Sequence, residues 1–205
     1  SLDKVYRMRL KFKQIETSDI IRISMDTHSD NRGEVSEIYN QNQFHQHGIL
    51  DNFIHEVENR SKFNVVRGFH YQARENQLSK LIRVVSGCYK CVFIDIRQSS
   101  DKLGTVYSHI LDDYKEMVYV PIGYALGIQS LDHTNHFIYK MSQTYDHSYA
   151  RSINPLKGTQ ALLDSDGNSL SSILDEGTSS LPPPEVSETD KNAPLWDEYL
   201  KKPEY

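Results

Sequence analysis

Cysteine is scarce in this chain of 205 residues, which carries only Cys88 and Cys91. Two cysteines form no disulfide framework, and so small a number suits a reducing compartment. Their C-x-x-C spacing falls in a strand pattern, where positions i and i+3 point to opposite faces. A zinc or redox site at these thiols is therefore disfavoured, and we expect a cytoplasmic protein.

Long hydrophobic runs are also missing. No apolar segment approaches the roughly 20 residues of a membrane span, and the N-terminal stretch lacks the apolar core of a signal peptide. The net charge of −5 is unfavourable for a broad basic surface that would bind nucleic acid. We expect no membrane or nucleic-acid partner, and an anionic ligand has to be met by a local cluster of arginine and lysine.

The sequence has no long helical pattern and no glycine-rich phosphate loop before a helix, which argues against a doubly wound nucleotide-binding fold. It has instead 13 tyrosines, 7 phenylalanines and several short segments typical of strands. These segments include "RMRLKFKQI", "KLIRVVSG", "YKCVFIDIR" and "NHFIYKMSQTY". Strands at such regular spacing, with turn signals between them, predict an all-β jelly roll or barrel.

Turn residues predict how some of these strands connect. Asp30, Asn31 and Gly33 mark a turn before a short strand, and "QNQFHQHGILDNF" is a short helix or a loop. Ser86-Gly87 predicts a hairpin between the strands that flank it. Pro121 and Gly123 mark a tight corner further along the chain.

The composition changes after Pro155, where Ser, Asp and Pro predict loop for much of residues 156–205. A short C-terminal helix is expected within "SETDKNAPLWDEYLKK", and Ser187 and Asp190 there have the spacing of a capping box. The length and the lack of internal repeats predict one domain over residues 1–205, with its core at about residues 5–155.

A set of motifs extends over about residues 25–197. In chain order they are "DNRGEVSEIYN", "RGFHYQ", "KLIRVVSG", "FIDIRQSS", "VYVPIGYALGIQSL", "FIYKMSQTY" and "SETDKNAPL". In type and order they resemble the dTDP-4-dehydrorhamnose 3,5-epimerase family. The resemblance implies a cupin-type jelly roll that forms a homodimer. It also implies an enzyme of deoxysugar biosynthesis that acts on a nucleotide-diphosphate sugar, with no cofactor and no metal.

A 4-keto sugar has acidic C–H bonds at C3 and C5, beside its carbonyl group. Epimerisation there needs a base on one face, an acid on the other and stabilisation of the enolate oxygen. By the resemblance, His70 is the base and Asp190 orients it, while Lys80 stabilises the enolate oxygen and Tyr139 is the acid. Each also has an ordinary structural role open to it, such as helix capping for Asp190.

The same resemblance suggests the substrate contacts. Arg67 and Arg32 are expected to bind the diphosphate and the sugar, because guanidinium groups grip phosphate oxygens in a bidentate manner. Tyr145 is expected near the sugar and the nucleotide. Three further substrate contacts are predicted within or near these motifs: Gln72, His55 and Glu37.

The sequence departs from the family's pattern around the predicted site. Leu126 stands where the family has a histidine, in "GYALGI". His55 and Val57 replace a glutamine and an asparagine, Cys91 stands where aspartate is common, and Thr144 replaces a tyrosine. The proton-transfer residues are thus retained while the recognition residues differ.

Several alternatives stay open at this point. Retained proton transfer with altered recognition fits a single-site 3- or 5-epimerase, or a 3,4-ketoisomerase, on another nucleotide sugar. Leu126 also fits a non-catalytic cupin that binds a sugar nucleotide. A metal-dependent cupin oxygenase would use His45, His47 or His70, although "HQH" is not followed by the usual glutamate.

Overall fold

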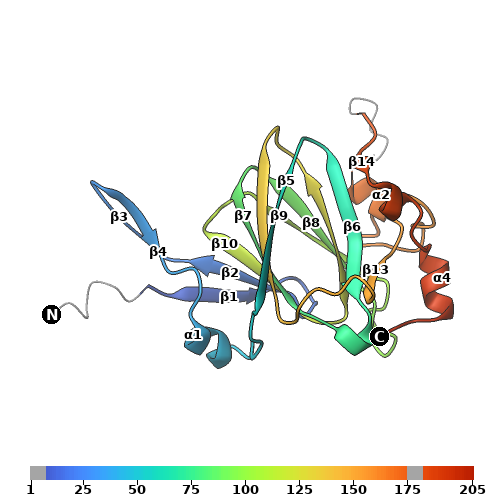
Figure 1. Ribbon diagram of the computed structural model, residues 1–205, viewed down its shortest axis with the longest axis horizontal. Helices are drawn as coiled ribbons and strands as arrows, with labels where there is room; N and C mark the ends of the chain where they lie inside the picture. The colour runs from blue at the N-terminus through green and yellow to red at the C-terminus, as the bar shows by residue number, and fades with distance from the viewer. Residues whose placement is uncertain (1–7, 175–181) are drawn as a thin grey trace.

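The computed structural model describes residues 8–174 and 182–205, and most of its regular structure is β-strand (Figure 1). The first sheet has the spatial order β1 (Leu10–Gln14), β2 (Ile21–Met25), β10 (Glu116–Val120), β7 (Lys80–Ser86), β12 (Asn135–Met141) and β5 (His55–Ser61). The second sheet has the order β13 (Ala150–Ser152), β6 (Val65–Gln72), β11 (Tyr124–Ser130), β8 (Tyr89–Asp95) and β9 (Val106–Leu111). The predicted all-β architecture is confirmed.

Shorter elements surround the two sheets. The hairpin of β3 (Thr27–Asp30) and β4 (Gly33–Ser36) contains the predicted turn and projects from the body as an arm (Figure 1). β14 (Glu185–Val186) pairs in parallel with β6. The helical elements are α1 (Gln41–Gln46), the 3-10 turn η2 (Arg74–Asn76), α2 (Leu170–Ile173), α3 (Glu188–Lys191) and α4 (Trp196–Lys201). Within the described residues, none of these helices could span a lipid bilayer.

The main core lies between the two sheets. Ile82 and Phe137 of the first sheet belong to the same buried cluster as Phe93, Tyr107 and other residues of the second. Strand residues that point inward alternate with residues that point outward, because successive side chains lie on opposite faces of a strand. The edge strand β5 shows this alternation clearly, with exposed positions between partly buried ones.

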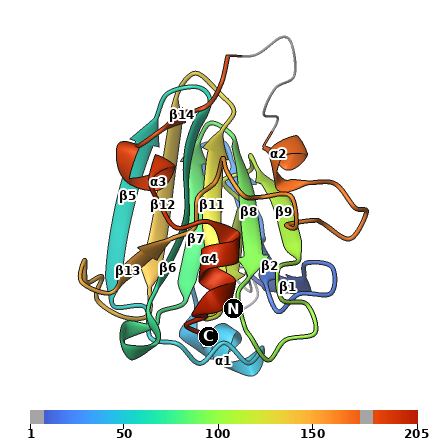
Figure 2. The same ribbon diagram turned by 90° about the vertical axis from the view of Figure 1, so that its right-hand side faces the viewer.

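Strand β8 is buried on both faces, as its nearly unbroken apolar run indicates. Cys91 and Phe93 face the first sheet, whereas Val92 and Ile94 pack under the C-terminal part of the chain. Trp196 of α4 contributes to this second cluster, and Figure 2 shows α4 lying across the outer face of the second sheet. The C-terminal residues therefore form part of the packed structure.

The hairpin predicted at Ser86-Gly87 is wrong. β7 pairs with β10 and β12 in the first sheet, whereas β8 pairs with β9 and β11 in the second. Gly87, with φ of 83°, carries the chain across from one sheet to the other. Local turn chemistry predicts that the chain reverses, but it does not specify which strand becomes the partner.

Two further expectations can be compared with the structure. The corner at Pro121 and Gly123 is present between β10 and β11, and Gly123 has φ of 93°. The C-terminal region forms two short helices, α3 and α4, where we expected one. Pro194 lies between them, and a proline disfavours helical conformation in the preceding residue and removes a hydrogen-bond donor.

We predict that Gly87→Ala destabilises the fold more than Gly167→Ala, although both glycines have φ of 83°. A Cβ on Gly87 would lie 2.5 Å from the backbone oxygen of Thr134, whereas a Cβ on Gly167 would meet nothing within 4 Å. The backbone strain of about 1–2 kcal/mol is common to both variants. The clash should add about 1–3 kcal/mol to the loss at Gly87, measured by urea unfolding. Equal losses of stability in the two variants would contradict the close approach of Gly87 to Thr134 at the crossing between the sheets.

Candidate active site

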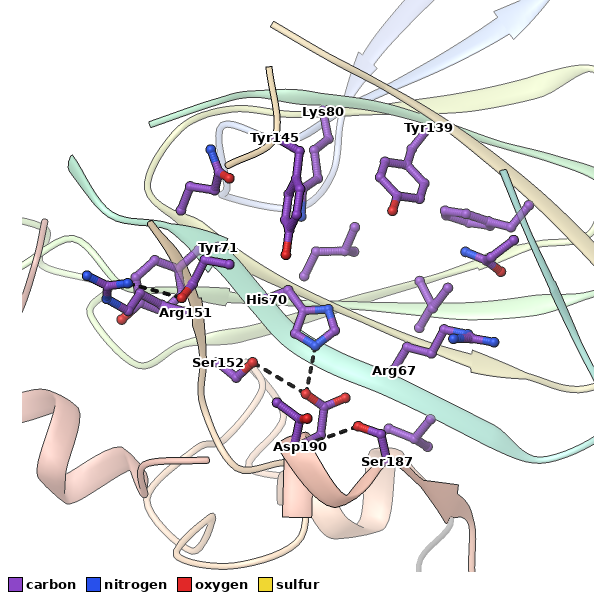
Figure 3. A pocket seen from close by; sticks show the side chains of 18 of the residues that line it. Arg67, His70, Tyr71, Lys80, Tyr139, Tyr145, Arg151, Ser152, Ser187 and Asp190 are labelled. Carbon is purple, nitrogen blue, oxygen red and sulfur yellow. Dashed lines mark hydrogen bonds and ion pairs between the residues drawn. The ribbon is translucent and has the colours of Figure 1, made fainter. Parts of the chain in front are cut away.

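A cavity of about 550 Å³ is lined mainly by β6, β7, β11, β12, β13 and α3 (Figure 3). It gathers all the predicted catalytic residues and part of the predicted substrate contacts. These are His70, Tyr139, Lys80 and Asp190, together with Arg67, Tyr145 and Gln72. Residues that are far apart in the sequence thus meet around one space.

His70 and Asp190 form the best-defined contact of the cavity. The Nε2 atom of His70, on β6, lies 2.7 Å from Oδ1 of Asp190, on α3, although 120 positions separate the two in the chain. In the neutral imidazole, this contact requires Nε2 to carry the proton, which leaves the lone pair on Nδ1. The ring is partly exposed to the cavity, with 44% of the side chain accessible.

The Asp190 carboxylate is buried, with 4% of the residue exposed, and has several donors around it. The backbone N–H of Gly68 donates to Oδ2 at 3.3 Å, and the hydroxyl of Ser152 donates to Oδ1 at 3.3 Å. Burial raises the pKa of Asp190, but the hydrogen bond and charge of His70 and the Gly68 N–H together lower it below its ordinary value. The carboxylate is therefore ionised at neutral pH.

Helix capping and the contact with His70 use different atoms around Asp190. Ser187 caps α3 by accepting a hydrogen bond from the backbone N–H of Asp190 at 3.1 Å. The carboxylate itself points toward His70 (Figure 3). The Ser187–Asp190 spacing thus reflects a helix cap, and the aspartate side chain has a separate role.

Tyr139 belongs to the first sheet, opposite the second sheet that carries His70. It lies on β12, and its ring projects into the cavity that His70 faces from β6 (Figure 3). Burial raises the pKa of Tyr139, and Tyr145 nearby raises it further, while the positive charge of Arg67 lowers it. The net effect keeps the phenol protonated at neutral pH, so that it is able to donate a proton.

Lys80 begins β7 and lines the same cavity. Part of its side chain remains accessible, yet burial of the ammonium group lowers the pKa of Lys80 to about 8. Burial is the only cause of this shift, so no carboxylate of the described chain compensates the charge. A negative charge that develops on a ligand would pair with the Lys80 ammonium group.

Two of the predicted substrate contacts, Arg67 and Gln72, line the cavity but differ in how far their polar groups are already bonded within the protein. The guanidinium of Arg67 donates to Ser61 Oγ at 3.2 Å and to the Arg60 carbonyl at 3.4 Å, and both acceptors are neutral. The Gln72 amide donates to the Asn76 carbonyl and accepts from the Asp146 N–H, at 2.7 and 2.8 Å. No carboxylate neutralises the Arg67 guanidinium in these contacts, so its charge is available to a ligand. Gln72 instead holds the segments of Asn76 and Asp146 in place.

The remaining predicted contacts lie outside the cavity lining. Arg32 is at the tip of the β3–β4 arm, 2.5 Å from Asp30. Glu37 accepts hydrogen bonds from Asn40 and Gln43, next to α1. The structure does not bring either residue together with the cavity of its own chain, and their role as substrate contacts stays a prediction.

His55 contacts the site indirectly, through Tyr145. Its Nδ1 accepts a hydrogen bond from the backbone N–H of Tyr145 at 3.1 Å, which holds Tyr145 beside the cavity.

Sequence reasoning missed Ser152, which pairs with His70 across β13 and β6 and bonds to Asp190. The sequence around Ser152 gives no signal that it bonds to Asp190, because only the pairing of β13 with β6 places it beside His70.

Comparison with known proteins agrees with this geometry. The family model described as dTDP-4-dehydrorhamnose 3,5-epimerase matches residues 14–198. This chain belongs to that family. It is 33% identical over 137 residues to the dTDP-4-dehydrorhamnose 3,5-epimerase of Salmonella typhimurium, which covers 66% of this chain and 75% of that one. It is 31% identical over 142 residues to the Methanothermobacter thermautotrophicus enzyme of the same name, which covers 68% and 76%.

Solved structures of the family show the same fold. The dTDP-4-dehydrorhamnose 3,5-epimerase of Elizabethkingia anophelis is 26% identical with a TM-score of 0.77, covering 98% of this chain and 100% of that one. The dTDP-6-deoxy-D-glucose-3,5-epimerase of Legionella pneumophila, solved with dTDP-4-keto-L-rhamnose, is 26% identical with a TM-score of 0.74 and covers 92% and 93%. The predicted cupin-type jelly roll is therefore confirmed.

We predict that Asp190→Asn destabilises the protein at pH 7 by about 1–3 kcal/mol, because a buried charged acceptor of several hydrogen bonds is lost. The folded-state pKa of Asp190 is depressed, so its contribution to stability is present above the ordinary pKa of 3.8 and lost as the pH falls through the lower folded value. The difference from the parent protein should therefore shrink by pH 3 in urea unfolding.

Glu188→Gln on the same helix is the matched control, since 81% of the Glu188 side chain is exposed. This control should change stability little at either pH. A loss at Asp190→Asn that was the same at pH 7 and pH 3 would contradict the ionised, hydrogen-bonded carboxylate.

Proposed function

We propose that this protein epimerises a dTDP-linked 4-keto-6-deoxy sugar, by removing and returning a proton on a carbon beside the ketone. The observation that carries the proposal is the position of His70 and Tyr139, which face one cavity from opposing sheets (Figure 3). Membership of the epimerase family supports it. So does the family's Legionella structure, solved with dTDP-4-keto-L-rhamnose.

The chemistry follows from the protonation states of these groups. His70 Nδ1 removes the proton, and the Asp190 carboxylate stabilises the imidazolium that forms. The electrons of the broken C–H bond move onto the carbonyl oxygen, which the Lys80 ammonium stabilises. Tyr139 donates a proton to the opposite face of the carbon, which inverts its configuration, and solvent then restores both side chains. The ketone is itself the electron sink, so the proposed reaction needs no cofactor.

Ligand orientation and assembly are also part of this proposal. Arg67 is available to bind the diphosphate, because its present acceptors are neutral. The β3–β4 arm projects from the body of the molecule (Figure 1), and none of its residues lines the cavity of its own chain. Val35 and Ile38, on and beside the arm, are 55% and 40% exposed. A homodimer would cover these apolar side chains, and Arg32 and Glu37 could then act only on a neighbouring copy. Two free thiols are consistent with a cytoplasmic enzyme.

Proton exchange in deuterated water tests the proposal. The protein should introduce deuterium into a dTDP-4-keto-6-deoxy sugar, followed by NMR at C3 and C5. His70→Ala should lower the exchange rate by about 10²-fold or more, because the base is lost. Tyr139→Phe should keep exchange and lose inversion, because His70 would return deuterium to the face from which it took the proton.

The exposed His133, which lies against Phe63, supplies the control variant His133→Ala, and its exchange rate should equal that of the parent. Exchange at both carbons indicates the double epimerase, and exchange at one indicates a single-site enzyme. Binding without exchange, or exchange that survives loss of His70, would overturn the proposed function.

The proposed role of Lys80 predicts a pH dependence. Because burial lowers the pKa of Lys80 to about 8, the stabilising ammonium is present below that pH and is lost above it. Exchange should therefore decline above about pH 8, and Lys80→Met should be slower by about 10²–10³-fold with no such decline. A decline above pH 8 that persists in Lys80→Met would assign it to another group.

A further inference from the structure

The cavity contains two arginines whose charges are compensated to different degrees. Figure 3 shows Arg67 and Arg151 on opposite sides of His70. Arg151 forms an ion pair with Glu204 at 3.0 Å. Among the residues that the structure describes, no ion pair joins Arg67 to a carboxylate, although Glu185 also lines the cavity. An anionic group of a ligand is therefore attracted most strongly to the Arg67 side.

The Arg67 guanidinium lies against β5, the edge strand of the first sheet. Its Nε donates to Ser61 Oγ at 3.2 Å and its Nη2 to the Arg60 carbonyl at 3.4 Å, whereas Nη1 has no acceptor within the described part of the chain. Asn59 lies two positions before Ser61 on β5, so both side chains project to the same face of the strand. Asn59 also lines the cavity, which places its amide next to the Arg67 side.

Tyr89 holds the Asn59 amide from below. Tyr89 belongs to β8 and is fully buried, and its hydroxyl donates to Oδ1 of Asn59 at 3.4 Å. Burial raises the pKa of Tyr89, while a hydrogen bond from Ser61 and the positive charge of Arg67 lower it. The amide oxygen of Asn59 is thus occupied, and its NH2 group has no acceptor among residues 8–174 and 182–205.

The direction of the hydrogen bonds around Tyr89 favours this orientation of the amide. Arg67 can only donate, so Ser61 accepts from Arg67 and its own O–H is left to donate to Tyr89. The Tyr89 O–H then needs an acceptor, which is Oδ1 of Asn59. With the amide reversed, Tyr89 would face a second donor and its buried O–H would lose its acceptor, which is unfavourable.

We infer that Nη1 of Arg67 and the NH2 group of Asn59 together bind an oxyanion of the ligand, and that Tyr89 positions Asn59 for this role. The inference rests on the proposed function for the identity of the oxyanion, which is then a phosphoryl oxygen of the nucleotide diphosphate. Hydrogen bonds to such an oxygen are charge-assisted and stronger than neutral ones.

The binding of dTDP, measured by titration calorimetry in about 0.15 M salt, tests the role of Asn59. Asn59→Ala should weaken binding about tenfold or more, because a hydrogen bond to a charged group is lost. Asn59→Asp should weaken binding further, because a carboxylate then faces the phosphoryl oxygen.

Asn42→Asp is the matched control for the added charge. Asn42 is an exposed residue of α1 and does not line the cavity. Because salt screens distant exposed charges, Asn42→Asp should change the affinity for dTDP less than about twofold.

Tyr89→Phe tests the positioning role, since it removes only the hydroxyl. It should weaken dTDP binding about threefold or more in the parent protein and have no further effect in the Asn59→Ala variant, because the two residues act through one contact. A loss of the same size in both backgrounds would show that Tyr89 acts independently of Asn59 and would overturn its positioning role.

The outcomes separate this inference from the proposed function. Unchanged dTDP affinity in Asn59→Ala and Asn59→Asp would overturn the oxyanion site, while proton exchange by the parent protein would still support the epimerase. Proton exchange without measurable dTDP binding would also overturn the oxyanion site alone. A parent protein that neither binds dTDP nor exchanges protons would overturn the proposed function and this inference together.

Discussion

The hydrogen bond between His70 and Asp190 joins two parts of the chain that are 120 positions apart in the sequence. His70 is fixed by β6, an inner strand of the second sheet, and Asp190 by the short helix α3. α3 alone has four residues and cannot be stable in isolation. Its position depends on the C-terminal residues that pack against the sheet, including Trp196 and Tyr199.

A second constraint is the crossing of the chain between the sheets. From β5 to β8, and again from β9 to β13, each strand lies in the opposite sheet from the one before it. This topology places the proposed base and acid, which belong to β6 and β12, on opposing walls of one cavity. The separation of the two groups is set by the packed core between the sheets, so core packing and proton transfer are linked.

The sequence predicted much of this arrangement and failed at identifiable places. Alternating and buried strand patterns predicted the all-β fold, and ordered motifs predicted that His70, Lys80, Tyr139 and Asp190 belong to one site. The partner of β7 could not be predicted, because Ser86-Gly87 has the same turn chemistry in a hairpin and in a crossing. Ser152 was missed because its role arises only from its pairing with His70. Arg32 lies outside the cavity of its own chain because the arm that carries it projects outward (Figure 1).

The central claim is that one carbon of the substrate lies between His70 and Tyr139. A crystal structure of the protein with a bound dTDP-4-keto-6-deoxy sugar, or an unreactive analogue of it, measures this directly. The account predicts a carbon beside the carbonyl at about 3–3.5 Å from His70 Nδ1, with the Tyr139 hydroxyl on its other face and Lys80 at the carbonyl oxygen. A sugar bound with both neighbouring carbons turned away from His70, or with His70 and Tyr139 on the same face, would contradict it.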